Sequence, residues 1–120
     1  MKIQEMSIDL ETYSDVDIKK GCVYKYAESD NFEILLFAAS INNDPVVVYD
    51  LACGDVLPED IIDALVDDTV TKWAFNAAFE RICLSYWPKK HYPEKFQSYS
   101  ILEDTVGNYL NPVSWRCTMI

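Results

Sequence analysis

The chain has 120 residues, half of them hydrophobic, and a formal net charge of −10 from 10 basic and 20 acidic residues. This length fits one domain with its own core and leaves no room for a second. The acidic balance argues against a nucleic-acid binder that works through a basic patch, but it does not exclude a nuclease whose metal ions reverse the local field.

The four cysteines do not predict a zinc site, because they lie about thirty residues apart without a Cys-x-x-Cys pair. The longest apolar run, residues 34–39, is too short to cross a bilayer, and the N-terminus lacks an apolar signal region. We therefore expect a cytoplasmic protein with reduced thiols and no membrane partner.

The first half of the chain predicts three strands and a helix. Residues 3–11 read as a strand, followed by a polar loop that ends near Gly21. Residues 32–42 and 46–49 predict a hairpin, because the segment between them has turn chemistry. Pro58 fits the first turn of a helix whose apolar residues recur at helical spacing.

The second half predicts a strand over residues 70–75 and a helix from 77 to about 86, capped by Asn76 and ended by Pro88. Trp73 and Phe75 are expected in the core. Residues 89–112 predict a long excursion with a short helix over 102–109, and residues 114–120 a strand that enters a helix. The chain then stops without a cap, as expected of a truncated domain. This order predicts a mixed α/β sheet with its first strand near the centre.

Asp9 and Glu11 are the first candidate site residues. On a strand they point to the same face, where two carboxylates repel each other unless a cation lies between them. Hard divalent cations take such oxygen ligands. A chain of this composition contains about one Asp-x-Glu pair by chance, so the context matters. Glu80 adds a third acid at a strand-to-helix junction. The alternatives are an edge strand with a solvated face and an ordinary first-turn acid.

Four segments in this order resemble a known family: 9–14 (DLETYS), 21–27 (GCVYKYA), 75–80 (FNAAFE) and 115–119 (WRCTM). They resemble the amino-terminal part of the 3′–5′ proofreading exonuclease domain of a phage-type family A DNA polymerase. The resemblance implies a DnaQ-like, four-carboxylate domain with a ribonuclease H-like mixed sheet flanked by helices. Residues 1–120 would form part of that domain, without its C-terminal helices.

The resemblance also implies roles for individual residues. Asp9, Glu11 and Glu80 would be catalytic and would hold two Mg²⁺ or Mn²⁺ ions, although the wider superfamily often has Asp where Glu80 stands. Four further residues would lie beside the terminal nucleotide: Leu10, Thr12, Asn76 and Phe79. The third motif, a Tyr or His shortly before an Asp, has no match before Ile120. Asp104 is a conceivable substitute.

The expected function is hydrolysis of the 3′ terminal nucleotide of single-stranded DNA, with a polymerase domain in the parent protein as partner. Because the fourth carboxylate is missing, we expect weak or no activity from the chain alone. The alternative is a catalytically inactive acidic module that binds a basic partner or mimics DNA. The sequence does not separate DNA from RNA as the substrate.

Overall fold

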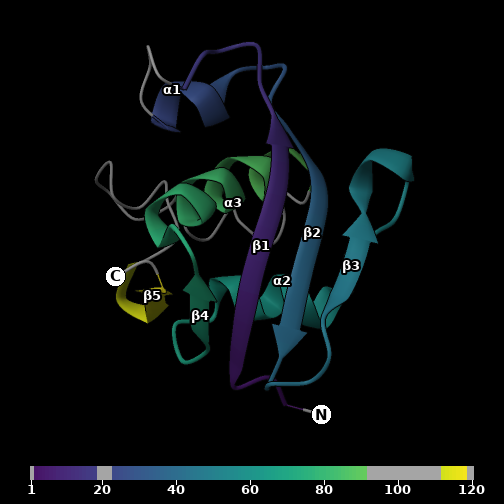
Figure 1. Cartoon of the computed structure of the whole chain (residues 1–120), viewed down its shortest axis with the longest axis vertical. Helices are drawn as coiled ribbons and strands as arrows, with labels where there is room; N and C mark the ends of the chain where they lie inside the picture. The colour runs from purple at the N-terminus through teal and green to yellow at the C-terminus, as the bar shows by residue number, and fades with distance from the viewer. Residues whose placement is uncertain (1, 19–22, 92–111, 119–120) are drawn as a thin grey trace.

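The computed structural model describes residues 2–18, 23–91 and 112–118. The elements are β1 (Glu5–Tyr13), α1 (Val23–Glu28), β2 (Glu33–Ile41), β3 (Val47–Asp50), the 3-10 turn η1 (Leu51–Cys53), α2 (Glu59–Val66), β4 (Thr71–Ala74), α3 (Ala77–His91), the 3-10 turn η3 (Pro112–Ser114) and β5 (Trp115–Cys117) (Figure 1). The predicted strands, the hairpin and the two longer helices are confirmed.

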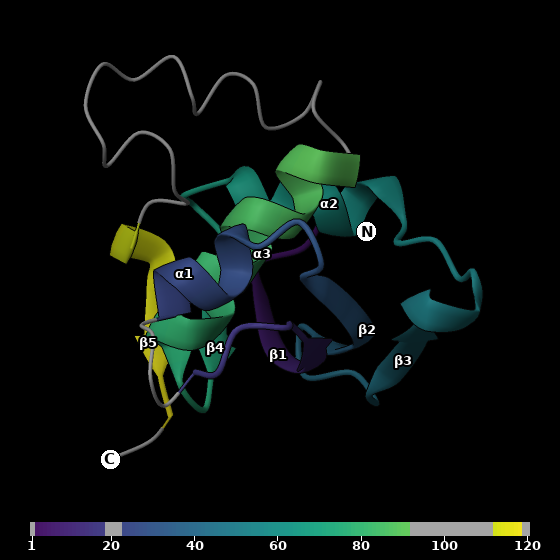
Figure 2. The same ribbon diagram turned by 90° about the horizontal axis from the view of Figure 1, so that it is seen from above.

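The strands form one sheet in the order β3-β2-β1-β4-β5. β2 is antiparallel to β1 and β3, whereas β4 is parallel to β1 and β5. In the described chain, α2 and α3 lie behind the sheet as seen in Figure 1 and the opposite face carries no helix, which is clear from above in Figure 2. The expected α/β, ribonuclease H-like mixed sheet with a central first strand is confirmed.

The core lies between the sheet and these helices. β1 contributes the buried side chains of Met6 and Ile8 to this core. The alternating residues Ser7 and Asp9 point away from it and are exposed. The predicted apolar face of α2 is buried through Ile61, Ile62 and Leu65. The alternation along β1 therefore determines which of its side chains reach the uncovered face.

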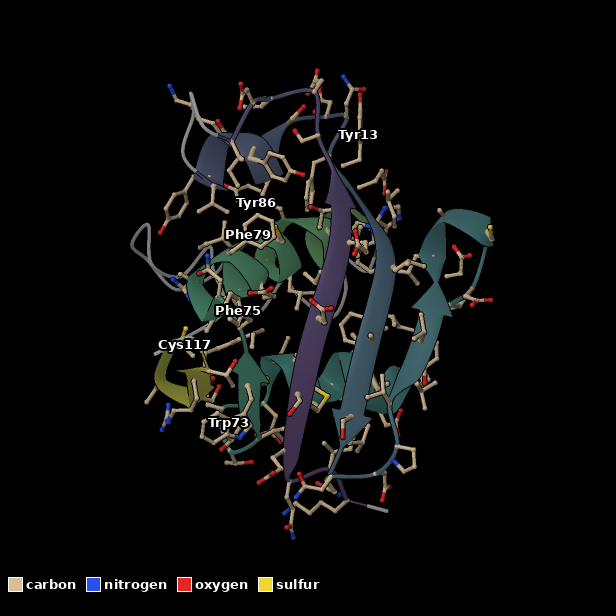
Figure 3. All side chains as sticks on the ribbon, in the orientation of Figure 1. Tyr13, Trp73, Phe75, Phe79, Tyr86 and Cys117 are labelled. Atoms are coloured by element: carbon tan, nitrogen blue, oxygen red, sulfur yellow. The ribbon has the colours of Figure 1, made fainter. Side chains whose placement is uncertain are left out.

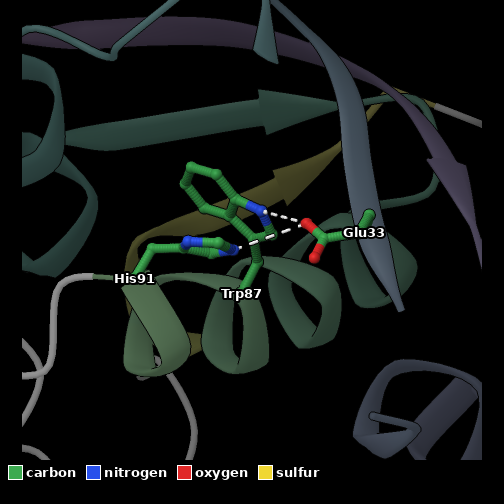
Figure 4. Close-up of polar contacts among 3 residues, drawn as sticks. All are labelled: Glu33, Trp87 and His91. Atoms are coloured by element: carbon green, nitrogen blue, oxygen red, sulfur yellow. Dashed lines mark hydrogen bonds and ion pairs between the residues drawn. The ribbon is translucent and has the colours of Figure 1, made fainter. Parts of the chain in front are cut away.

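The prediction that Pro88 ends the second long helix is wrong, since α3 continues to His91. A proline inside a helix costs a hydrogen bond and a steric clash, so the last turn needs other contacts. Glu33 of β2 supplies them. Its Oε2 accepts a hydrogen bond from Trp87 Nε1 at 3.2 Å and lies 3.4 Å from His91 Nε2 (Figure 4). The rings of Trp87 and His91 also pack, with centroids 4.6 Å apart.

Helix α1 was not predicted, because six residues are too few to show a helical period. The predicted helix 102–109, the helix expected after the last strand and the candidate acid Asp104 lie outside the described residues. Within the described ranges, no helix is both long and apolar enough to span a membrane.

A buried lysine connects β4 to the segment before β5, in addition to the backbone pairing of the two strands. Lys72 of β4 is fully buried, and its Nζ donates to the Asp67 carbonyl at 2.6 Å and to Ser114 Oγ at 3.1 Å. Burial lowers the pKa of this ammonium to about 8. These contacts connect the ends of α2 and η3 to β4. The three parallel strands β1, β4 and β5 all end on the side of the sheet where α3 begins.

Candidate metal centre

Asp9 and Glu11 lie on the uncovered face of the central strand, and both are exposed. β1 lies in the middle of the sheet, but its pairing with β4 ends at Ile8, so in the described chain Asp9 and Glu11 pair with β2 alone. The edge-strand alternative with a solvated face is therefore wrong for the first part of β1 and stays open for these two charges. Both carboxylates are therefore accessible to solvent on the same face of the sheet.

The end of β4 lies directly beside Asp9. Ile8 is the register partner of Ala74, the last residue of β4, so the chain leaves this strand at the level of Asp9. Asn76 then caps α3 as predicted, and its Oδ1 accepts a hydrogen bond from Phe79 N at 3.4 Å. Its carbonyl accepts from Glu80 N at 3.1 Å. The cap thus fixes the first turn that carries Glu80.

Glu80 is buried, with only 6% of its surface exposed, and its Oε2 has no hydrogen-bond partner among the described residues. Burial, with a smaller contribution from the charge of Asp9, raises the pKa of this carboxyl to about 7. A buried carboxylate oxygen without a partner is costly in a protein interior. A bound cation would remove this cost.

Among the described residues, no three His, Cys, Asp or Glu side chains are gathered closely enough to hold a metal ion. Asp9 and Glu80 are close enough for their charges to interact. Glu11 lies two residues beyond Asp9 on the same face, next to the point where the register of β1 against β2 shifts. The extra residue at this irregularity is Leu35 of β2, because Glu11 pairs with Leu36 and Thr12 with Ile34.

The four residues predicted to contact the nucleotide have structural partners in the chain. Leu10 and Phe79 are half-buried and pack against the core. Thr12 is half-buried, and its Oγ1 lies 2.9 Å from Tyr26 Oη in a hydrogen bond. Asn76 caps α3. Leu10 and Thr12 alternate with the two acids of β1, so they lie on its opposite face. Their contact with a nucleotide stays a prediction.

The prediction that Trp73 and Phe75 are core residues is wrong, since 36% of Trp73 and 66% of Phe75 are exposed (Figure 3). The alternation of β4 buries Lys72 and Ala74 and so turns Trp73 outward. Phe75 follows the end of the strand, where its carbonyl accepts a hydrogen bond from Cys117 Sγ at 3.0 Å. Both side chains, predicted to lie in the core, are therefore exposed to solvent.

Sequence reasoning missed Tyr26 and Cys83. Tyr26 belongs to the unpredicted α1, and only its place in the segment 21–27 of the resemblance marked it. Cys83 lies one turn after Glu80 and is fully buried, which raises the pKa of its thiol to about 12, with a further contribution from Glu80. In the metal-free chain this thiol therefore stays protonated at neutral pH.

The fold and these side chains define a ribonuclease H-like α/β domain with acidic residues where its central strand meets the first turn of a helix. The chain is similar to the DNA polymerase of Bacillus phage SP02, with 42% identity over 118 residues. The match covers 98% of this chain but 15% of that polymerase, so the chain spans a short part of its relative. No protein-family model and no solved structure matches the chain.

Proposed function

We propose that the chain is part of a two-metal 3′–5′ exonuclease centre in a protein related to phage DNA polymerases. The observation that carries the proposal is the buried oxygen of Glu80, which has no partner among the described residues and belongs to a carboxyl whose pKa the charge of Asp9 helps to raise. The similarity to a phage DNA polymerase supports DNA as the substrate and a polymerase region as the partner.

The residues fit Mg²⁺ or Mn²⁺, because Asp9, Glu11 and Glu80 offer only carboxylate oxygens, which hard divalent cations prefer. These three side chains would hold the ions. When bound, two such ions supply the charge that activates a water molecule and stabilises the leaving 3′ oxygen.

The chain itself supplies position and access. Asp9 is held by a strand that is hydrogen-bonded on both sides up to Ile8, and Glu80 by a helix whose first turn Asn76 caps. The face that carries Asp9 and Glu11 is uncovered in the described chain, so the end of a nucleic-acid strand can reach it. Catalysis of this kind depends mainly on such positioning.

The assay of this proposal follows 3′-labelled and 5′-labelled single-stranded DNA with Mn²⁺ or Mg²⁺. We expect slow metal-dependent release of nucleotides from the 3′ end, because the sequence lacks a match to the third motif. The variants Asp9→Ala and Glu11→Ala should lose this release. The same assay with RNA of equal sequence decides between the two substrates.

Hydrolysis that survives both substitutions would contradict the site. Metal binding without hydrolysis would restrict the 120-residue chain to a metal-binding part of the centre. Absence of both, together with tight binding to a cationic protein, would favour the acidic interaction module, for which the net charge of −10 is the supporting observation.

A further inference from the structure

The half of β1 that carries the two acids has fewer strand partners than the other half. Residues 6–8 pair with both β2 and β4, but in the described chain residues 9–13 pair with β2 alone. The ladder to β2 is itself irregular there, with a register shift between Glu11 and Thr12. The extra residue there is Leu35 of β2, so the segment around Glu11 is held by one partner strand with an irregular ladder and has fewer sheet contacts than residues 6–8.

Tyr26 supplies a further contact to this segment from α1. Its hydroxyl is hydrogen-bonded to Thr12 Oγ1 at 2.9 Å, on the residue directly after Glu11. Because Thr12 lies on the opposite face of the strand from Glu11, the bond fixes the backbone between them without occupying the acidic face.

The ring of Tyr26 contacts the other arm of the candidate centre. Its centroid lies 6.0 Å from that of Phe79, the residue directly before Glu80, with the planes inclined by 47°. It also packs edge to face on the buried Phe32 at 5.8 Å, which fixes the ring itself. One half-buried side chain thus touches the neighbours of two acids that lie far apart in the sequence.

We propose that Tyr26 is a positioning residue that fixes the Glu11 segment of β1 relative to the Glu80 turn of α3. Its hydroxyl acts on the β1 arm and its ring on the α3 arm. The functional role of Tyr26 rests on the proposed function, since the relative position of the two acids matters when they share metal ions. The physical connection between the two arms does not depend on that function.

The two halves of the side chain can be tested separately. Tyr26→Phe removes the hydroxyl and keeps the ring, whereas Tyr26→Leu removes both. In the metal-free chain, Tyr26→Phe should speed amide hydrogen exchange about fivefold at residues 11–13 and leave Glu80 unchanged. Tyr26→Leu should speed exchange at both places. Tyr24→Phe, an exposed tyrosine on the same helix, is the matched control.

Manganese affinity distinguishes a positioning role of Tyr26 from a general contribution to stability. Tyr26→Phe and Thr12→Val should each weaken Mn²⁺ binding about threefold to tenfold at unchanged melting temperature. The double variant should be no weaker than either single one, because both remove the same hydrogen bond.

Unchanged exchange at residues 11–13 in Tyr26→Phe would overturn the inference. An equal rise that includes Ile61 and Ile62 of α2 would also overturn it, since Tyr26 would then contribute only to global stability. If the unmodified chain binds no Mn²⁺, the proposed function fails, and the exchange pattern still decides whether Tyr26 connects the two arms.

Discussion

Replacement of Asp9 by asparagine is expected to abolish the stabilisation of the chain by manganese. At a concentration one hundred times the dissociation constant, a bound ion raises the free energy of unfolding by about 2.7 kcal/mol. Asp9 shares its strand face with Glu11 and its charge acts on Glu80, so in the proposed centre its loss removes the acid that connects the other two. The measurement is thermal unfolding at increasing Mn²⁺ concentration.

Asp60→Asn is the matched control, because Asp60 is an exposed acid on α2, away from the acidic face. It should keep the full stabilisation by manganese. Equal stabilisation in Asp9→Asn and Asp60→Asn would show that the ion binds to the diffuse acidic surface. The assignment of Asp9 as a ligand would then be wrong.

Glu80→Gln is expected to make the metal-free chain more stable at pH 8 while it weakens metal binding. The pKa of Glu80 is raised to about 7 from an ordinary value of 4.5, so the folded state holds its proton more tightly than the unfolded state. Stability from this group is complete below pH 4.5 and is lost as the pH rises through 7. At pH 8 the neutral amide should gain about 1 to 3 kcal/mol over the buried carboxylate.

Denaturant unfolding at pH 5.5 and pH 8 measures this difference. The advantage of Glu80→Gln over the unmodified chain should grow between the two values, whereas Glu28→Gln, at an exposed acid of α1, should show no such growth. A variant that is less stable than the unmodified chain at pH 8 would mean that the Glu80 carboxylate is stabilised in the fold. The proposed need for a cation would then disappear.

Local patterns in the sequence predicted most of the sheet. The alternation in residues 3–11, the turn chemistry at 42–45 and the cap at Asn76 each report on neighbours in the chain, and each is confirmed. The central place of β1 followed from the order of the elements. The extent of α3 did not, because the contacts of Glu33 with Trp87 and His91 join residues more than fifty positions apart.

The candidate site was predicted less completely than the fold. The sequence pointed to Asp9, Glu11 and Glu80, but not to the burial of Glu80 or to its electrostatic interaction with Asp9, both of which depend on the packing of α3 against the sheet. Trp73 was placed in the core because large aromatic side chains are usually buried, whereas the four-residue β4 has an exposed face. Tyr26 acts through two contacts across space that no local pattern contains.

Paramagnetic broadening by Mn²⁺ in the nuclear magnetic resonance spectrum of the unmodified chain tests the central claim most directly. Substoichiometric Mn²⁺ should broaden the amide signals of residues 9–11 and of the first turn of α3 before any others. Signals of α2, which carries several exposed acids, should stay sharp. Broadening that begins at α2, or that spreads evenly over all acidic segments, would contradict a metal centre formed by Asp9, Glu11 and Glu80.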